Sequence, residues 1–228
     1  MSPSHRCGAQ QSEGHFDNVR HKGYIIPHMH DVDHDALYKA AESQAGYFTT
    51  QQALAAGMDP STLRHHARPA GRYERVRRGL YRLRHFPTSP HEHVVAAWLP
   101  LRDAGAVVSH ESALELYELS DVIPNAVDLS MSRSKRGQRS RPGVRLHTLE
   151  HPPEDAEIRM LAGVPVTTPE RTILDALQGG TQLEQLELAV AQAVDRGLTT
   201  PRRLRSAAAS RPARVRAFVD HALQREAA

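Results

Sequence analysis

The sequence predicts an α+β protein, mostly helical, with an N-terminal winged helix-turn-helix followed by a mixed α/β second domain. Three observations support this. Two helix-start signals, at Thr49 and at Asp59–Pro60, enclose a short turn. Two short runs then flank Arg77–Arg78–Gly79, a pattern typical of a hairpin. Further along, helical periodicities alternate with short apolar runs.

Residues 1–32 show no apolar periodicity, so we expect a disordered leader. Its end holds several potential metal ligands (His28, His30, Asp31, Asp33 and His34). Their spacing matches no closed tetrahedral pattern, so no metal is expected. An alternative hypothesis is that translation starts at Met29 rather than Met1.

Residues 33–86 form the predicted winged helix-turn-helix domain. A helix over 33–43 is followed by a capping box, in which Thr49 and Gln52 satisfy each other's backbone N–H groups. Gly57 allows the positive φ of the turn, and Asp59 with Pro60 begins the second helix. Arg64 lies on the outer, polar face of this helix, opposite its apolar side.

Charge is concentrated on this motif. Residues 60–86 contain eight arginines and one acid, Glu74, whereas the whole chain carries a net charge of only +3. Clustered cations gain affinity for duplex DNA by releasing counterions. The predicted DNA-binding residues are Ser61, Thr62, Arg64, His65, Arg68, Arg75, Arg77, Arg78 and Arg82. The alternative is a winged helix used only for protein contacts, with a solvated arginine face.

The second predicted domain covers residues 90–225, after a Pro-rich linker. We expect helices over 91–103, 109–119, 183–196 and 213–224, and two more beginning at Thr168–Pro169 and Thr200–Pro201. Strands are expected over 126–131 and 143–149, and a hairpin over 156–167.

A second basic cluster lies in the loop between the first two of these strands, interpreted as a hairpin loop. It could hold phosphate beside the wing, bind RNA or an acidic partner, or be a solvated loop. Its cations are Arg133, Lys135, Arg136, Arg139 and Arg141.

No catalytic, metal-binding or cofactor-binding residues are predicted. Ser109–His110 is interpreted as a helix cap, because neighbouring side chains on a helix do not face each other. The His91–Glu92–His93 run fails as a metal pair for the same geometric reason. One cysteine, Cys7, and the lack of a long apolar run indicate a cytoplasmic protein without membrane contact.

Specific motifs resemble the AbiEi antitoxin family of type IV toxin–antitoxin pairs. They are residues 46–57, the Ser-Thr-Leu-Arg helix, Arg75–Tyr81, residues 108–114 (VSHESAL) and residues 165–175 (PVTTPERTILD). The resemblance covers about residues 35–223. It implies a repressor of its own operon that binds operator DNA near its promoter. It also implies an antitoxin that counters a nucleotidyltransferase-like toxin without a stable complex.

Two other functions remain open at this point. One is a stand-alone winged-helix transcriptional regulator without a toxin partner. The more distant one is a nucleic-acid-processing enzyme, which would need clustered carboxylates and usually a lysine. The three lysines, at 22, 39 and 135, lie near no such group in the sequence.

Overall fold

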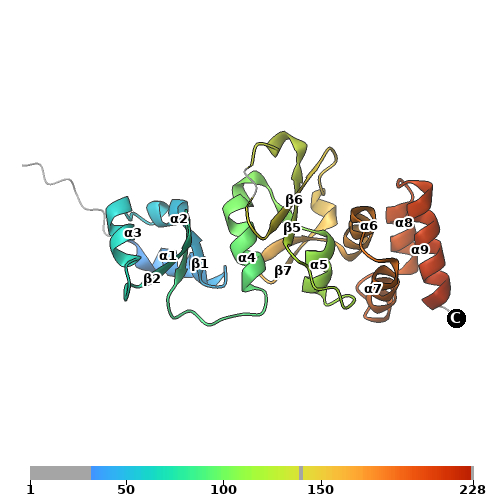
Figure 1. Ribbon diagram of the computed structural model, residues 1–228, viewed down its shortest axis with the longest axis horizontal. Coiled ribbons are helices and arrows are strands. Elements are labelled where there is room, and N and C mark those ends of the chain that lie inside the picture. The colour runs from blue at the N-terminus through green and yellow to red at the C-terminus, as the bar shows by residue number, and fades with distance from the viewer. Residues whose placement is uncertain (1–31, 139–140, 227–228) are drawn as a thin grey trace, which may run out of the picture. The chain divides into compact units, whose positions relative to one another are not determined.

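The computed structural model describes residues 32–138 and 141–226 (Figure 1). The predicted leader and the choice between Met1 and Met29 fall outside the described residues, as does Arg139 of the basic loop. From Val32 onward the described residues form one compact unit. The predicted fold class is confirmed, since helices and two sheets make up this unit.

The N-terminal part has the element order of a winged helix. Its three strands form an antiparallel sheet in the order β1-β3-β2. The hairpin of β2 and β3 is the wing, and Gly79 turns it with a φ of +81°. The elements are α1 (His34–Glu42), β1 (Tyr47–Thr49), α2 (Thr50–Ala55), α3 (Pro60–His66), β2 (Tyr73–Arg77) and β3 (Leu80–Leu83).

The caps predicted at Thr49 and Asp59 form, whereas Thr168 makes no side-chain cap at the start of its helix. Thr49 and Gln52 make the reciprocal capping box, and Asp33 accepts a hydrogen bond from the N–H of Ala36. Asp59 accepts from the N–H groups of Ser61 and Thr62. Each cap satisfies N–H groups that the first helical turn leaves unpaired, which stabilises its helix by about 1 kcal/mol.

Aromatic side chains hold the winged part together. Phe48 is fully buried, with its ring edge-to-face on Tyr73 at 4.9 Å and stacked on Tyr81 at 5.7 Å between ring centroids. Leu37 and Leu63 bring α1 and α3 onto the same cluster. Burying such side chains contributes about 1.5–3 kcal/mol each.

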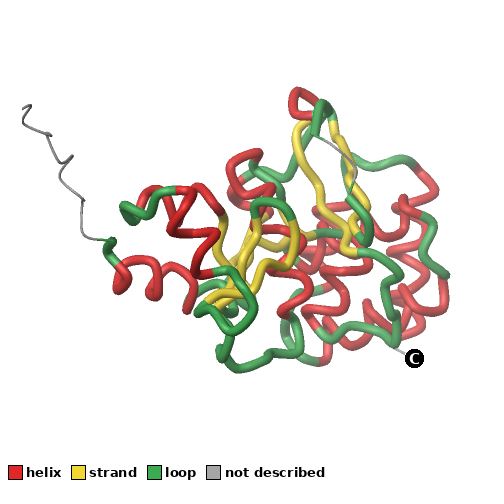
Figure 2. Tube along the Cα trace, turned by 60° about the vertical axis from the view of Figure 1, so that its left-hand side comes forward, coloured by secondary structure: helices red, strands yellow, loops and turns green. Residues whose placement is uncertain are grey.

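The C-terminal part contains a five-stranded mixed sheet in the order β6-β5-β4-β8-β7. Figure 2 shows the strands of the protein in yellow among the helices in red. Its strands are β4 (Val107–Val108), β5 (Val127–Ser132), β6 (Val144–Leu149), β7 (Ile158–Leu161) and β8 (Val164–Thr167). The helices are α4 (Glu92–Trp98), α5 (His110–Tyr117), α6 (Pro169–Gly179), α7 (Leu183–Asp195), α8 (Pro201–Ala208) and α9 (Ala213–Glu226). Three short 3-10 turns are η1 (Leu99–Ala104), η2 (Arg133–Lys135) and η3 (Asp155–Glu157).

The interpretation of the basic loop as a hairpin loop is wrong. β5 and β6 pair in parallel, with Val127 opposite Val144 and Ser132 opposite Leu149. The chain between β5 and β6 therefore crosses over to the start of the next strand and does not turn back as a hairpin. The β7–β8 hairpin, in contrast, is antiparallel as predicted.

Two predicted helices differ in detail. The helix expected over 91–103 is α-helical only to Trp98 and continues as η1, where Pro100 cannot donate to the α-helical ladder. Ser109 does lie at the start of α5, but its side chain makes no cap. It bonds the Ser130 hydroxyl instead, at 2.7 Å.

The winged part also packs on the larger core. Tyr47 and Leu80, from β1 and β3, belong to the apolar cluster that contains Trp98 of α4 and the five-stranded sheet. The boundaries of two domains, 33–86 and 90–225, therefore stay a prediction. In the described part of the chain, no helix is long and apolar enough to span a membrane.

Candidate nucleic-acid interface

The start of α3 is organised by Asp59. Its carboxylate accepts hydrogen bonds from the hydroxyls and the backbone N–H groups of Ser61 and Thr62. These four donors hold the pKa of the Asp59 carboxyl well below its usual range. Both hydroxyls, predicted as DNA contacts, are therefore donating within the protein and fix the first turn of the helix.

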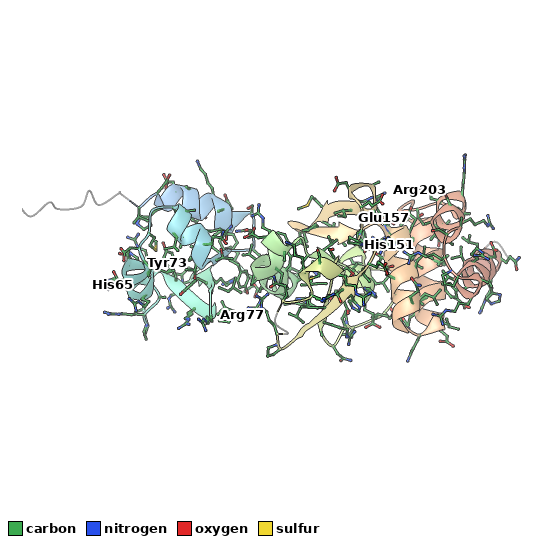
Figure 3. All side chains as sticks on the ribbon, turned by 90° about the horizontal axis from the view of Figure 1, so that it is seen from above. His65, Tyr73, Arg77, His151, Glu157 and Arg203 are labelled. Atoms are coloured by element: carbon green, nitrogen blue, oxygen red, sulfur yellow. The ribbon has the colours of Figure 1, made fainter. Side chains whose placement is uncertain are left out.

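The outer face of α3 carries two of the predicted basic side chains. Arg64 and His65 are exposed there, and His65 is labelled in Figure 3. Arg68 is also exposed, but the helix ends at His66, so the prediction that Arg68 lies on this helix is wrong. The Nε of Arg64 donates to the carbonyl of Pro60 at 3.1 Å, and the described chain offers its two terminal nitrogens no partner. The Arg64 side chain is thus fixed at Nε, while its two terminal nitrogens can donate to an external acceptor.

The wing arginines divide into two groups. Arg75 and Arg78 are exposed. Arg77 instead donates to the carbonyl of Ala96 in α4, and burial lowers the pKa of its guanidinium. Arg82 is paired with Glu92 at 3.0 Å and also donates to the carbonyls at Phe86 and Pro87.

Arg84 has a positioning role that sequence reasoning did not identify. Its Nε donates to the carbonyl of Gly71 at 2.6 Å, and Nη2 donates to the carbonyls of Arg68 and Tyr73. The planar guanidinium thereby ties the end of α3 to the start of the wing. Nothing in the sequence distinguishes Arg84 from the neighbouring arginines.

Comparison with known proteins bears on this region. Residues 35–84 match the family model described as the transcriptional regulator AbiEi antitoxin. The predicted AbiEi resemblance is confirmed over these residues, and its extension to residue 223 stays a prediction. The match contains α1 through β3 and ends at Arg84, and we call these residues the AbiEi-type region.

A solved structure is similar over a longer stretch. The RV2827C protein from Mycobacterium tuberculosis superposes with a TM-score of 0.53 at 15% identity, over 83% of this chain and 75% of that one. At this identity the likeness concerns the fold alone. No curated protein matches the chain.

Outside the AbiEi-type region, the second basic cluster lies on the crossover between β5 and β6. Arg133, Lys135 and Arg136 are exposed and form no ion pair within the described residues. Arg141 is half-buried, which lowers the pKa of its guanidinium. These residues can meet an external anion, but on a crossover and not at a hairpin tip.

The Thr-Pro-Glu-Arg-Thr motif is part of the core of the C-terminal part. Glu170 accepts from the Thr199 hydroxyl at 2.5 Å and pairs with Arg203 at 3.0 Å. Arg171 pairs with Asp175 at 2.6 Å and with Glu157 at 2.8 Å (Glu157 and Arg203 are labelled in Figure 3). The motif therefore joins the β7–β8 hairpin and α8 to α6.

Proposed function

We propose that the protein is a DNA-binding transcriptional regulator of the AbiEi antitoxin type. One observation carries this proposal: five arginines of the AbiEi-type region point to solvent, while the other three are bonded inside the protein. The outward ones are Arg64, Arg68, Arg72, Arg75 and Arg78. The family match over the same residues supports the regulator function independently.

In this proposal α3 enters the major groove and the wing lies along the adjacent backbone. Arg64 and His65 read base edges, because both side chains are exposed on the outer face of α3. Arg75 and Arg78 contact phosphates, which positions the protein without reading sequence. Arg77, Arg82, Ser61 and Thr62 act indirectly, through the internal bonds described above.

The test uses DNA from upstream of the protein's own operon and a random duplex of equal length. Arg64→Ala should weaken binding to the specific site by about 1–3 kcal/mol and relax preference at one base position. Arg202→Ala, an exposed arginine on α8, is the matched control and should leave binding unchanged. An equal loss for Arg64→Ala on both duplexes would show that this side chain contacts only the backbone.

We further propose an antitoxin role against a nucleotidyltransferase-like toxin, with repression of the shared operon. The test is co-expression with the neighbouring reading frame, if that frame encodes such an enzyme. The full chain should restore growth that the toxin alone arrests. A chain that binds its operator and gives no rescue would instead be a stand-alone regulator.

A further inference from the structure

A row of polar side chains lies buried on one face of the five-stranded sheet. Asp128 and Ser130 alternate along β5 and are both fully buried. In the parallel register they lie beside Arg145 and His147 of β6. Apolar side chains at these positions would give a more stable fold, because a buried polar group lowers stability unless it is hydrogen-bonded.

One atom in this row is not bonded. Asp128 accepts hydrogen bonds on Oδ1 from His147 at 2.7 Å and from Arg145 at 3.2 Å. Its Oδ2 is buried, and no donor reaches it from the described residues. A buried carboxylate oxygen without a hydrogen bond destabilises the folded state by about 1–3 kcal/mol. A donor from outside the chain would recover this free energy.

His110 stands beside Asp128 in a strained backbone conformation. Its φ is +52°, which is rare for a residue other than glycine. This conformation brings Nδ1 within 2.9 Å of the Ser109 hydroxyl, so the expectation that these two side chains do not meet is wrong. The His110 ring stacks on that of His147, with centroids 3.7 Å apart.

The close approach of α6 fixes the His110 ring. A Cβ added to Gly179 would lie 3.0 Å from the ring, so a larger residue there would require the ring to shift by a few tenths of an ångström. Burial lowers the pKa of His110 to about 4, with a smaller contribution from His147. His110 is therefore uncharged near neutral pH and adds no positive charge to its surroundings.

A cavity of about 330 Å³ opens beside these residues. Asp128 lines it together with Glu111, which accepts a hydrogen bond from Thr181 on one oxygen only. The C-terminal end of α6, at Gly179 and Gly180, also lines it and presents the negative end of the helix dipole. Arg145 is the one guanidinium in the lining, and it is already paired with Asp128.

We propose that this cavity binds a small organic cation, an ammonium or guanidinium group, with Asp128 and Glu111 as its acceptors. Two carboxylates, a helix C-terminus and an uncharged histidine favour a positive N–H donor over an anion. A metal ion fits less well, because no three His, Cys, Asp or Glu side chains gather as ligands in the described part of the chain. The site is distinct from the AbiEi-type region and does not depend on DNA binding.

The test is calorimetric titration of the full chain with agmatine, which carries both an ammonium and a guanidinium group. We expect saturable binding with one site per chain. Glu111→Gln should weaken it at least tenfold, since it removes a charged acceptor while keeping an oxygen for Thr181. Glu118→Gln, at the exposed end of the same helix, is the matched control and should bind like the parent.

N-acetylargininamide separates two sources of the same group. Tighter binding of this compound than of agmatine would identify an arginine side chain of another protein as the ligand, and the reverse order would identify a free amine. No saturable binding of either compound at 10 mM, roughly the weakest useful affinity, would overturn the proposal. So would an equal effect of Glu111→Gln and Glu118→Gln, or binding of inorganic phosphate in place of the cations.

Discussion

Arginine has opposite uses in the two halves of the described chain. In the AbiEi-type region, Arg64, Arg75 and Arg78 face solvent without an acidic partner. In the C-terminal part, Arg171 is nearly buried between Asp175 and Glu157, and Arg211 also reaches Asp175. The same side chain thus lies on the surface in the first group and in a core network in the second.

The number of acidic residues near these arginines explains why the two groups differ. Residues 60–86 contain only one acid, Glu74. Most arginines there face outward or donate to backbone carbonyls, as Arg77 and Arg84 do, and Arg82 reaches an acid outside this segment, Glu92. α6 itself provides Glu170 and Asp175 next to Arg171. Arginine number alone therefore says little about function, whereas arginine without nearby acid indicates an external anion.

The largest expected effect concerns the buried network. Asp175→Ala removes the partner of Arg171 and Arg211, and leaves a nearly buried guanidinium incompletely compensated. We expect the free energy of unfolding to fall by about 3–5 kcal/mol, measured by urea denaturation. The Arg205–Asp220 pair, about half exposed on both sides, is the matched control. Asp220→Ala should change stability by less than about 0.5 kcal/mol. Equal effects at the two sites would remove the distinction between core and surface arginines.

The second prediction uses the buried His110. An unfolded histidine binds a proton below about pH 6.5, whereas folded His110 resists protonation down to about pH 4. Stability from this group is therefore complete above pH 6.5 and decreases as the pH falls toward 4, by about 3 kcal/mol in total.

His110→Asn should remove this part of the acid sensitivity, since asparagine tolerates a positive φ and does not titrate. The measurement is the free energy of unfolding of parent and variant at several values between pH 7 and pH 4. Parallel curves for the two proteins would show that His110 can take up a proton without unfolding.

The third and smallest effect separates the two groups of wing arginines. Arg75→Ala with Arg78→Ala should flatten the slope of log affinity against log salt by about 2, because each lost phosphate contact contributes about 0.9. Unfolding should be unchanged. Arg77→Ala should leave the slope nearly intact and cost about 1 kcal/mol of stability, through its lost bond to α4. A reversed pattern would mean that Arg77 leaves α4 when DNA binds.

Local signals predicted much of the fold. The caps at Thr49 and Asp59 and the wing turn at Gly79 are each specified within a few residues, and all three form. The strands β1 and β4 were missed because three or two residues show no period. The parallel pairing of β5 and β6 was also missed. A parallel pair is usually joined by a dozen or more residues that include an α-helix, and the eleven residues between these strands show no helical period in the sequence.

The sequence predicts the candidate interface as a region, but it does not predict which of its side chains are bonded inside the protein. Alternation along a strand would place Arg75 and Arg77 on the same side of β2. The register shifts between these two residues, which redirects Arg77 toward α4. Such a bulge depends on pairing with β3 and on packing, neither of which a linear pattern contains. The polar row around Asp128 escaped notice because its members come from separate strands.

The three bonds of Arg84 have a consequence for the speed and selectivity of recognition. They connect the loop that follows α3, at Arg68 and Gly71, to the first residue of β2, Tyr73, so the path from helix to wing is fixed when the protein folds. A preformed spacing reduces the entropy lost on association. If α3 and the wing bind DNA as proposed, a duplex with an altered groove width would have to deform, or these three bonds would have to break. Lysine at this position, with a single charged nitrogen, could not hold the same three carbonyls in one plane.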